Sequence, residues 1–372
     1  MSLTLLANYL VKDFNGDITK AKDIPPFYSD CEAGGKAHRI LLWYAKQLSK
    51  EQLTFMQIFS LFRRAVNEKD LEGVFRLETE SLINKSLRDM TLFLFKRMVD
   101  NLCDRRLITK APHNTFTTHP LIKNYFESIF EEDAKKAAHE IIYYHLNSYA
   151  PARLESIEDI QPLLEQAHHG CLADCVDEAF VNIYVMKILC PKENQYQNVL
   201  VHKLGAWEAS LSFMKCFFPD GDIMRLPLVS DKNAQSWLMN EAGLSLLNLG
   251  HPIKAKELYL KKIALNIDDE KWKAASVGYQ HLSDLQIHSG EIVAATKSAE
   301  KALEYAEMAN DTMEKLYSQT YLGNAFGLSG NSKSAEKMFR EANKIHRSLR
   351  KALNSQLEIL IFSNELTLIG TA

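Results

Sequence analysis

The sequence predicts a mainly α-helical protein, in which an N-terminal region of helices with a small two-stranded wing precedes a superhelix of paired helices. Three observations lead to this prediction. Glycine and proline are scarce, with 15 and 10 copies in 372 residues, below their usual shares of about 7% and 5%. The last third of the chain repeats with a period of 40 residues. The remainder carries apolar residues at helical spacing, and turn residues interrupt it at few places.

Composition and charge exclude several classes of protein. Hydrophobic residues make up 46% of the chain and charged residues 24%, which is typical of a globular protein rather than a disordered one. The net charge of −3 creates no overall field toward nucleic acid or an acidic membrane. No apolar run reaches the ~18 residues of a membrane helix. The apolar segment 3–10 lacks a basic start and is followed by Lys12-Asp13, so we expect no signal peptide and no membrane partner.

The cysteines are few and scattered, which is typical of a reducing compartment. We therefore expect a cytoplasmic protein with free, mostly buried thiols. The six positions are Cys31, Cys103, Cys171, Cys175, Cys190 and Cys216.

The repeat is in register at a glycine, at an alanine five residues later and at a small residue seven positions earlier. These positions are Gly250, Gly290 and Gly330; Ala255, Ala295 and Ala335; and Gly243, Ser283 and Gly323. Small residues allow two antiparallel helices to approach closely, and glycine can supply a left-handed turn that ends the first helix. Each unit is thus predicted as helix, glycine turn and helix. The third unit, over 322–342, resembles a tetratricopeptide repeat, although the usual period is 34 residues.

Stacked units of this kind curve and leave a concave face. The inner helices are expected to point a polar ladder toward that face, where it could bind a peptide backbone. The ladder consists of Asn240, Gln280 and Thr320, followed one turn later by Leu244, Asp284 and Asn324. Ordinary solvated helix positions would explain the same residues equally well.

Residues 133–235 are predicted as irregular helical hairpins. Helices are expected over 134–148, 159–169, 176–189 and 203–218, with Gly170 ending the second and Pro219-Asp220-Gly221 forming a turn. Two histidines and two cysteines in this region suggest a zinc site, but their spacing fits no standard structural zinc pattern. These residues are His168, His169, Cys171 and Cys175. Packing at a helix–turn–helix joint explains them as well, and we expect no metal.

The N-terminal third divides into two parts. Residues 1–50 are predicted as a small helical domain, with helices over 3–11 and 36–48. Residues 51–132 have the element order of a winged helix. The expected elements are helices over 52–63, 69–75 and 89–104, strands at 107–108 and 115–117, and a closing helix over 120–130. The repeats of period 40 then fill residues 236–372.

Winged helices often bind DNA through the third helix. In this chain that helix is rich in apolar residues, and we expect it to pack on more than one face. The apolar residues are Leu92, Phe93, Leu94, Phe95, Met98, Val99 and Leu102. DNA-reading helices instead expose a polar, basic face. We therefore do not expect a nucleic-acid partner.

Several segments resemble a known family. The string from Thr118 to Phe126 resembles the sensor segment of NB-ARC-like signal-transducing ATPases with numerous domains (STAND), whose bacterial members carry tetratricopeptide arms. Segments 3–10 and 16–18 are similar to the small helical domain that follows the nucleotide-binding core. Segment 59–64 resembles the start of the winged helix, and segments 204–218 and 272–275 look like the arm. The resemblance covers nearly the whole chain.

One part of the family pattern is missing. No Gly-x-x-x-x-Gly-Lys-[Ser/Thr] motif occurs, and the nearest string, over 32–37, lacks its spacing and its magnesium-binding hydroxyl. The chain therefore resembles the portion after the ATPase core, either as an excised fragment or as a natural orphan. We expect no cofactor in this chain, and ATP or ADP only in a longer parent protein.

The resemblance implies a role for His119. In the family, a histidine at this place contacts the diphosphate of bound ADP, and an imidazole can donate a hydrogen bond to a phosphate oxygen. The plant and animal members of the family follow this histidine with aspartate, whereas this chain has Pro120. A capping or packing role for His119 is equally open.

The leading functional hypothesis is a non-enzymatic sensor and scaffold, the C-terminal portion of a signalling NTPase. The arm would bind a protein or peptide, and the winged helix would relay that event to an upstream nucleotide-binding domain. The alternative is a peptide-responsive transcription regulator whose winged helix binds DNA. An enzyme is not expected, because no Gly-x-Ser-x-Gly, His-Glu-x-x-His or Cys–His signature is present.

Overall fold

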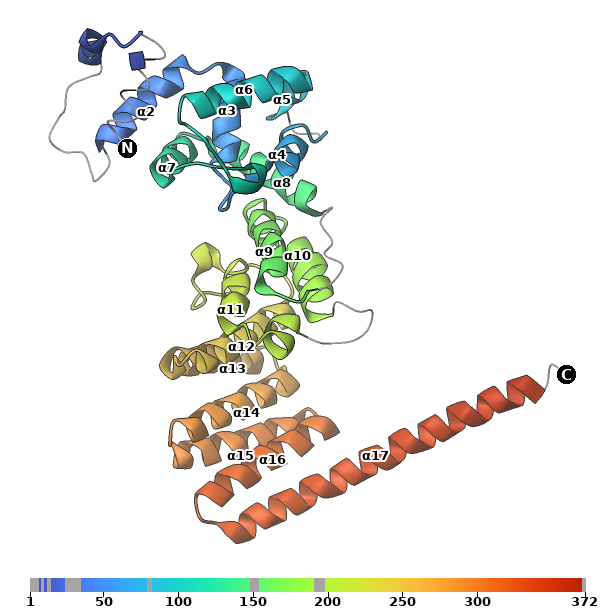
Figure 1. Ribbon diagram of the computed structural model, residues 1–372. Coiled ribbons are helices and arrows are strands. Elements are labelled where there is room, and N and C mark those ends of the chain that lie inside the picture. Colours follow the sequence, from blue (N-terminus) through green and yellow to red (C-terminus); the bar gives the residue numbers. More distant parts are fainter. Residues whose placement is uncertain are drawn as a thin grey trace. The chain divides into compact units, whose positions relative to one another are not determined.

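The computed structural model describes residues 7, 10–11, 15–23, 35–78, 82–147, 154–190 and 198–369. The predicted mainly α fold is confirmed (Figure 1). The chain divides into two compact units, residues 1–204 and residues 205–372. The finer division into four parts stays a prediction. Within the described residues, no helix has both the length and the apolarity that crossing a membrane requires.

The first unit is made of helices and one small sheet. Its helices are η1 (Ile18–Asp23), α2 (Gly35–Gln47), α3 (Lys50–Phe59), α4 (Glu68–Phe75), α5 (Lys85–Arg88), α6 (Leu92–Asp104), η2 (Pro112–Asn114), α7 (Pro120–Ser128), α8 (Glu132–Asn147), α9 (Ile157–Leu172), α10 (Val176–Ala179), η3 (Phe180–Leu189) and η4 (Val199–Lys203). The strands are β1 (Val66–Asn67), β2 (Thr109–Ala111) and β3 (Thr115–Thr117), which pair antiparallel in the order β1-β3-β2. The predicted helix over 3–11 lies mostly outside the described residues.

Local sequence signals explain where the principal helices of this unit begin. Ser49 and Gln52 form a capping box at the start of α3, and the Thr91 hydroxyl caps α6 by accepting from the Leu94 backbone N–H. The aromatic ring of Phe55 stacks on that of Phe75 at 4.4 Å between centroids, which ties α3 to α4 in the core.

The structure corrects several predicted boundaries here. The helix predicted over 52–63 ends at Phe59, and the helix predicted from residue 89 begins at Leu92, because Thr91 caps it. The strand predicted at 107–108 lies at Thr109–Ala111. Leu107 and Ile108 instead bury their side chains in the core. The short α5 and the two-residue β1 were not predicted, since such brief elements leave little periodicity in a sequence.

The sequence predicted that helix α6 packs on more than one face, but in the structure it buries a single face. Leu92, Phe93 and Leu94, in its first turn, are 43%, 73% and 46% exposed. Its buried stripe is formed by Phe95, Met98, Val99 and Leu102. The prediction was wrong because apolar residues at the beginning of a helix can lie past the edge of the core.

Helix α9 continues through Gly170, which therefore does not end it. A β-carbon at Gly170 would lie 2.9 Å from the ring of Tyr143 on α8. The glycine thus permits close contact between the two helices. The helix predicted over 176–189 is present, but from Phe180 it follows the wider π-type path of η3.

The second unit consists of paired helices. They are α11 (Trp207–Lys215), η5 (Pro219–Gly221), α12 (Lys232–Asn248), α13 (Pro252–Asp268), α14 (Trp272–His288), α15 (Ile292–Met308), α16 (Thr312–Leu328) and α17 (Ser332–Ile369). Helices α12 to α16 each have 17 residues. Neighbouring helices pack along the stack, and α14 contacts both α12 and α16 (Figure 1). The helix predicted over 203–218 is shorter, because η4 and Gly205 precede α11.

The three repeat glycines lie in equivalent turns. Their φ angles are +80° at Gly250, +76° at Gly290 and +82° at Gly330. At the middle turn, Gly290 N donates to Ile287 O at 3.0 Å and Glu291 N donates to Gln286 O at 2.8 Å, and the other two turns repeat this pattern. These are the two hydrogen bonds of a Schellman cap. The predicted 40-residue period is therefore confirmed in the backbone.

Small residues bring the helices of each pair together, as predicted. A β-carbon at Gly243 would lie 2.4 Å from the ring of Tyr259, and one at Gly323 would lie 2.8 Å from the ring of Phe339. In the middle unit Ser283 takes this place, and its hydroxyl donates to Ala295 O at 2.9 Å. A hydrogen bond thus replaces the aromatic contact in that unit.

Candidate functional site

The predicted ladder residues lie at the inner helices, but their polar groups already have partners. Asn240 is 7% exposed, and its Oδ1 accepts from Lys262 Nζ at 2.7 Å and from His281 Nδ1 at 2.6 Å. Gln280 is 4% exposed, and its Nε2 donates to Ser318 Oγ at 3.0 Å. These side chains connect neighbouring repeats, so a free polar ladder at Asn240 and Gln280 is not what the structure shows.

The remaining ladder positions are more accessible. Thr320 is half-buried and its hydroxyl donates to its own helix, to Leu316 O at 2.9 Å. Leu244 and Asp284 are half-buried, and Asn324 is exposed. Binding of a peptide by these residues stays a prediction.

A pocket of about 480 Å³ opens beside the first rung of the ladder. Its surface is mainly apolar, and it is built from α12, α13, α14, the turn before α14 and the end of α15. The residues around it are Asn233, Ser236, Trp237, Asn240, Lys262, Lys271, Trp272, Lys273, Ala274, Val277 and Ala309. This volume lies in the range of small-molecule sites, about 300–1,000 Å³.

A buried lysine forms part of this pocket. Lys262 on α13 is 2% exposed and forms no ion pair with any described residue. Burial lowers the pKa of its ammonium group to about 7, against the opposing charges of Glu241 and Glu314. Burial also raises the pKa of the Glu241 carboxyl group and lowers that of His281 to about 3. Burial thus acts against the charged forms of all three groups around Asn240.

Two tryptophans provide flat apolar surface. Trp272, at the start of α14, stacks on Tyr305 at 5.9 Å between centroids, with 14° between the ring planes. Tyr305 stacks in turn on Tyr279 at 5.5 Å. Trp237 on α12 is half-buried. The stacked column fixes the Trp272 ring, so one wall of the pocket is preorganised.

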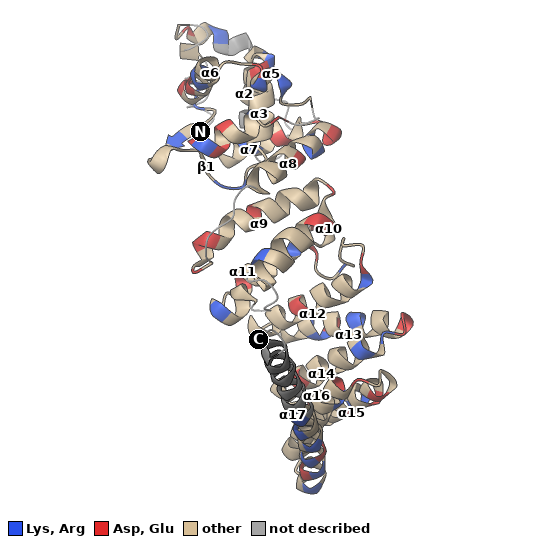
Figure 2. Ribbon diagram, turned by 90° about the vertical axis from the view of Figure 1, so that its right-hand side faces the viewer, with Lys and Arg blue, Asp and Glu red and all other residues tan. Residues whose placement is uncertain are grey.

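The charged rim is held by surface ion pairs. Lys273 Nζ lies 2.8 Å from the Asp311 carboxylate, and Lys271 Nζ lies 3.8 Å from that of Asp269. Both acidic and basic residues occur over α12 to α16 (Figure 2). The pocket itself has three lysines around it and no acidic residue.

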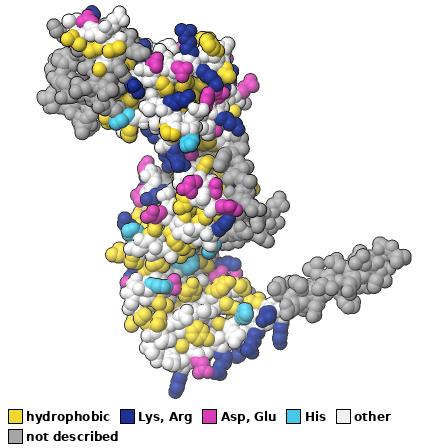
Figure 3. Space-filling model, in the orientation of Figure 1, with side chains coloured by type: hydrophobic (Ala, Val, Ile, Leu, Met, Phe, Trp, Pro, Cys, Tyr) yellow, Lys and Arg dark blue, Asp and Glu magenta, His cyan; other side chains and the backbone are white. Residues whose placement is uncertain are grey.

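Helix α17 carries a row of exposed basic side chains, drawn in dark blue in Figure 3. The row consists of Lys333, Lys337, Arg340, Lys344, Arg347 and Arg350. Residues three and four apart share one face of a helix, so the charges add on that face. Within the row, Arg340 is paired with Glu336 of the same helix at 2.6 Å.

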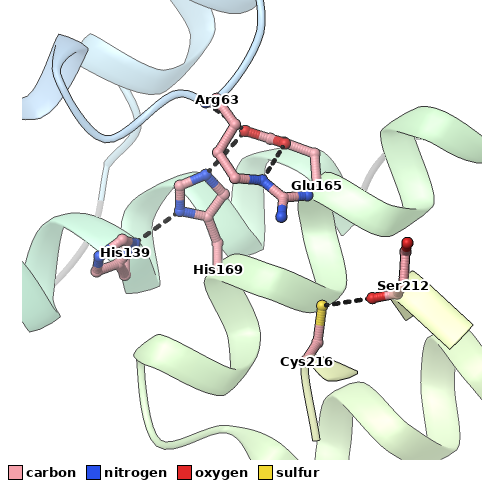
Figure 4. Close-up of polar contacts among 6 residues, drawn as sticks. All are labelled: Arg63, His139, Glu165, His169, Ser212 and Cys216. Atoms are coloured by element: carbon pink, nitrogen blue, oxygen red, sulfur yellow. Dashed lines mark hydrogen bonds and ion pairs between the residues drawn. The ribbon is translucent and has the colours of Figure 1, made fainter. Parts of the chain in front are cut away.

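The first unit holds a buried polar cluster (Figure 4). Arg63 donates to Glu165 through its backbone N at 2.9 Å and through Nε at 3.0 Å. His169, which is fully buried, lies with Nε2 3.4 Å from Glu165 Oε1 and Nδ1 2.7 Å from His139 Nδ1. Burial favours a higher pKa for Glu165, but His169 and Arg63 outweigh it and lower that pKa to about 2. The carboxylate is therefore the fixed charge of this cluster, which links the loop after α3 to α8 and α9.

The two histidines considered for zinc pack against other rings. Burial lowers the pKa of His168 to about 3, and the ring of His169 packs against Phe62 at 6.0 Å between centroids. In the described part of the chain, no group of three or more His, Cys, Asp or Glu residues is arranged to hold a metal ion. The described cysteines form no disulfide with one another. Among them only Cys171 is buried and the others are half-buried, which corrects the expectation of mostly buried thiols.

His119 caps the N-terminus of α7. Its Nδ1 accepts from the Leu121 backbone N–H at 3.2 Å, the side chain is exposed, and Pro120 occupies the first helical position. Because Nδ1 accepts a hydrogen bond, a neutral ring carries its proton on Nε2. The structure thus gives the capping role and leaves the nucleotide role a prediction.

Sequence reasoning missed the pocket, although one signal was present. Lys262 occupies a position that recurs 40 residues later as Ala302 and again as Ala342, and both alanines are buried. A lysine where the next two repeats bury alanine indicates a special site in the first repeat. Trp237 and Trp272 gave no such signal, because tryptophan is common in helix interfaces.

Comparisons with known proteins do not assign this chain to a family. No protein-family model and no curated protein matches the chain. Among solved structures, the chain is similar to a signal transduction ATPase with numerous domains (STAND) with a tetratricopeptide repeat sensor from Pyrococcus horikoshii, at 14% identity and a TM-score of 0.34. The match covers 91% of this chain and 50% of that one, so the chain spans about half the length of that protein. At this TM-score the two structures are too different for fold or function to be transferred.

Proposed function

We propose that the chain is the non-enzymatic sensor and scaffold portion of a signalling NTPase of the STAND type. The second unit binds a protein or peptide ligand on the side formed by α12, α14 and α16. The observation that supports this most is the ligand-sized pocket between equivalent, regularly stacked repeats. Repeat units bury one face against their neighbours and use another for binding, which suits a sensor.

The first unit supplies the relay in this proposal. In support of this, α3, α4, α6, β2, β3 and α7 occur in the order predicted for a winged helix, with β1, α5 and η2 as additional elements. The Arg63–Glu165 contact ties the loop after α3 to α9, so a displacement of the hairpins is carried to that module. A ligand would act by favouring one arrangement over another, by an amount equal to its difference in affinity for the two.

The nucleotide belongs to a domain upstream of this portion. His119 suits the part of a phosphate sensor, because its exposed Nε2 is left to donate while Nδ1 accepts from Leu121 N. Isothermal titration of the chain with ADP should show no tight binding in the absence of that domain. Submicromolar binding of ADP to this chain by itself would contradict the assignment.

Ligand binding is tested with peptides selected from a random library against the whole chain. We expect Trp237→Ala to weaken the selected peptides by about tenfold or more, since aromatic residues dominate binding energies at such surfaces. Ile253→Ala, at a position on α13 that is 83% exposed and outside the pocket, serves as the control. If Trp237→Ala and Ile253→Ala bind the selected peptides equally tightly, the pocket side of the repeats is not the binding surface.

The alternative of DNA binding has little physical support. Lys96 on α6 is held by Glu68 at 3.0 Å and Glu72 at 2.9 Å, which offsets its charge. The first turn of the same helix exposes apolar side chains, of which Phe93 is 73% exposed. A DNA-reading helix needs basic and polar groups there.

A further inference from the structure

The pocket beside Asn240 combines an apolar body with a hydrogen-bonding base. Trp237 and Trp272 supply flat apolar surface, and Lys262 and Asn240 supply polar groups. A pocket that is mostly apolar but has a few convergent polar groups is the usual form of a small-ligand site.

The Lys262 amine has unused donor capacity. A protonated lysine has three N–H donors, and Asn240 Oδ1 accepts one of them at 2.7 Å. The other two have no hydrogen-bond partner among the described residues. An almost fully buried cation without a carboxylate at ion-pair distance is costly, and a ligand that supplies a negative charge would offset that cost.

The ionisable side chains that line the pocket are all basic, opposite in sign to a carboxylate ligand. Lys262, Lys271 and Lys273 belong to its lining, and no acidic side chain does. The acidic group nearest in sequence to Asn240 is Glu241, whose pKa burial raises. Asp311 lies 2.8 Å from Lys273 and Asp269 lies 3.8 Å from Lys271, so these two charges are offset. Lys262 is the lysine of the pocket that has no carboxylate at ion-pair distance among the described residues.

From this geometry we propose that the pocket binds an apolar organic acid, with its carboxylate accepting hydrogen bonds from Lys262 Nζ and its apolar body between Trp237 and Trp272. A free acid and the aromatic C-terminal residue of a polypeptide share this chemistry. The proposal deepens the proposed function, because it names the class of ligand for one end of the same binding surface.

The first test uses matched acid and neutral probes on the whole chain. Isothermal titration compares 4-phenylbutyrate with 4-phenyl-1-butanol, and acetyl-Gly-Gly-Phe with its C-terminal amide. We expect an acid to bind about tenfold or more tightly than its neutral partner, as for a charge-assisted hydrogen bond. Preference for phenylbutyrate identifies a free acid, and preference confined to the peptide identifies a chain end.

Substitutions locate the site. Lys262→Met keeps the length of the side chain and removes the amine, and it should abolish the preference for the acid. Lys254→Met, on the exposed face of the same helix, should leave the preference unchanged. Equal affinities of acid and neutral probe, or an acid preference that survives Lys262→Met, would overturn the proposal, as would the absence of binding by all four probes.

Proton uptake provides a second readout. With a pKa of about 7, Lys262 is mostly neutral at pH 8 before the acid binds. Titrations at pH 8 in phosphate and Tris buffers should show uptake of close to one proton per bound acid, and none in Lys262→Met. Zero uptake with the native chain would contradict the contact. If the four probes do not bind but Trp237→Ala still weakens the binding of the selected peptides, the organic-acid site is rejected and the proposed function is retained.

Discussion

Replacing Lys262 by methionine should stabilise the protein at neutral pH, by an amount that shrinks as the pH rises. The ammonium group has an ordinary pKa of 10.5, and burial lowers it to about 7 in the folded protein. The unfolded chain therefore binds more protons than the folded one between these pH values. The buried amine of Lys262 therefore lowers the free energy of unfolding by its full amount below pH 7, and this effect disappears as the pH rises through 10.5. The free energy of unfolding thus increases with pH in this window.

The size of the effect follows from the two pKa values. A shift of 3.5 units, 10.5 − 7, corresponds to about 4 kcal/mol at pH 7, where the folded group is half protonated. At pH 9 the same relation leaves about 2 kcal/mol. The advantage of Lys262→Met over the native chain should thus fall by about 2 kcal/mol between pH 7 and pH 9.

Urea unfolding followed by tryptophan fluorescence at pH 7, 8 and 9 measures this difference. Lys254→Met is the control, because it removes an exposed charge from the same helix. Comparison of variants cancels the titration of other groups. Parallel pH profiles for the native chain and Lys262→Met would refute the reasoning that Lys262 is buried without a compensating charge.

Three further predictions concern the packing and the polar cluster. Gly290→Ala should lower the free energy of unfolding by about 1 kcal/mol, because φ is +76° at this residue, although nothing lies within 4 Å of the added β-carbon. Thermal unfolding of the two proteins measures this difference. Gly243→Val should cost more, about 1–3 kcal/mol, because the β-carbon would meet the Tyr259 ring at 2.4 Å, and an unchanged midpoint would disprove the close contact. Glu165→Gln should cost about 3 kcal/mol at pH 7, because Arg63 and His169 lower the pKa of that carboxyl from 4.5 to about 2. This contribution is complete above pH 4.5 and is lost as the pH falls toward 2, so acid unfolding of the two proteins should converge there.

The repeat period was predictable from sequence because its signals are local. Gly250, Gly290 and Gly330 mark turns that only a positive φ can form, and a recurring glycine is visible in one chain. The strand predicted at 115–117 is confirmed as β3, whereas β2 lies two residues after its predicted start and the two-residue β1 was missed. Pairing with a distant strand, as Val66 pairs with Phe116, leaves no local pattern in the sequence.

The site was harder to predict than the fold. Asn240 was identified by its 40-residue spacing, but its partners Lys262 and His281 lie on other helices, and only packing shows that they occupy its Oδ1. Exposure at a helix end is also invisible in a sequence, as the apolar first turn of α6 shows with Phe93. Periodicity in a sequence indicates which residues lie on the same face of a helix. It does not indicate which residues of other helices they contact, because those contacts depend on how all the helices of the stack pack.

Hydrogen–deuterium exchange of the whole chain, with and without a selected peptide at saturating concentration, tests the central claim that the repeats form the ligand-binding surface. The account predicts that protection from exchange concentrates in α12 and α14, around the pocket beside Asn240. Protection confined to the first unit, with exchange over residues 232–288 unchanged, would contradict it.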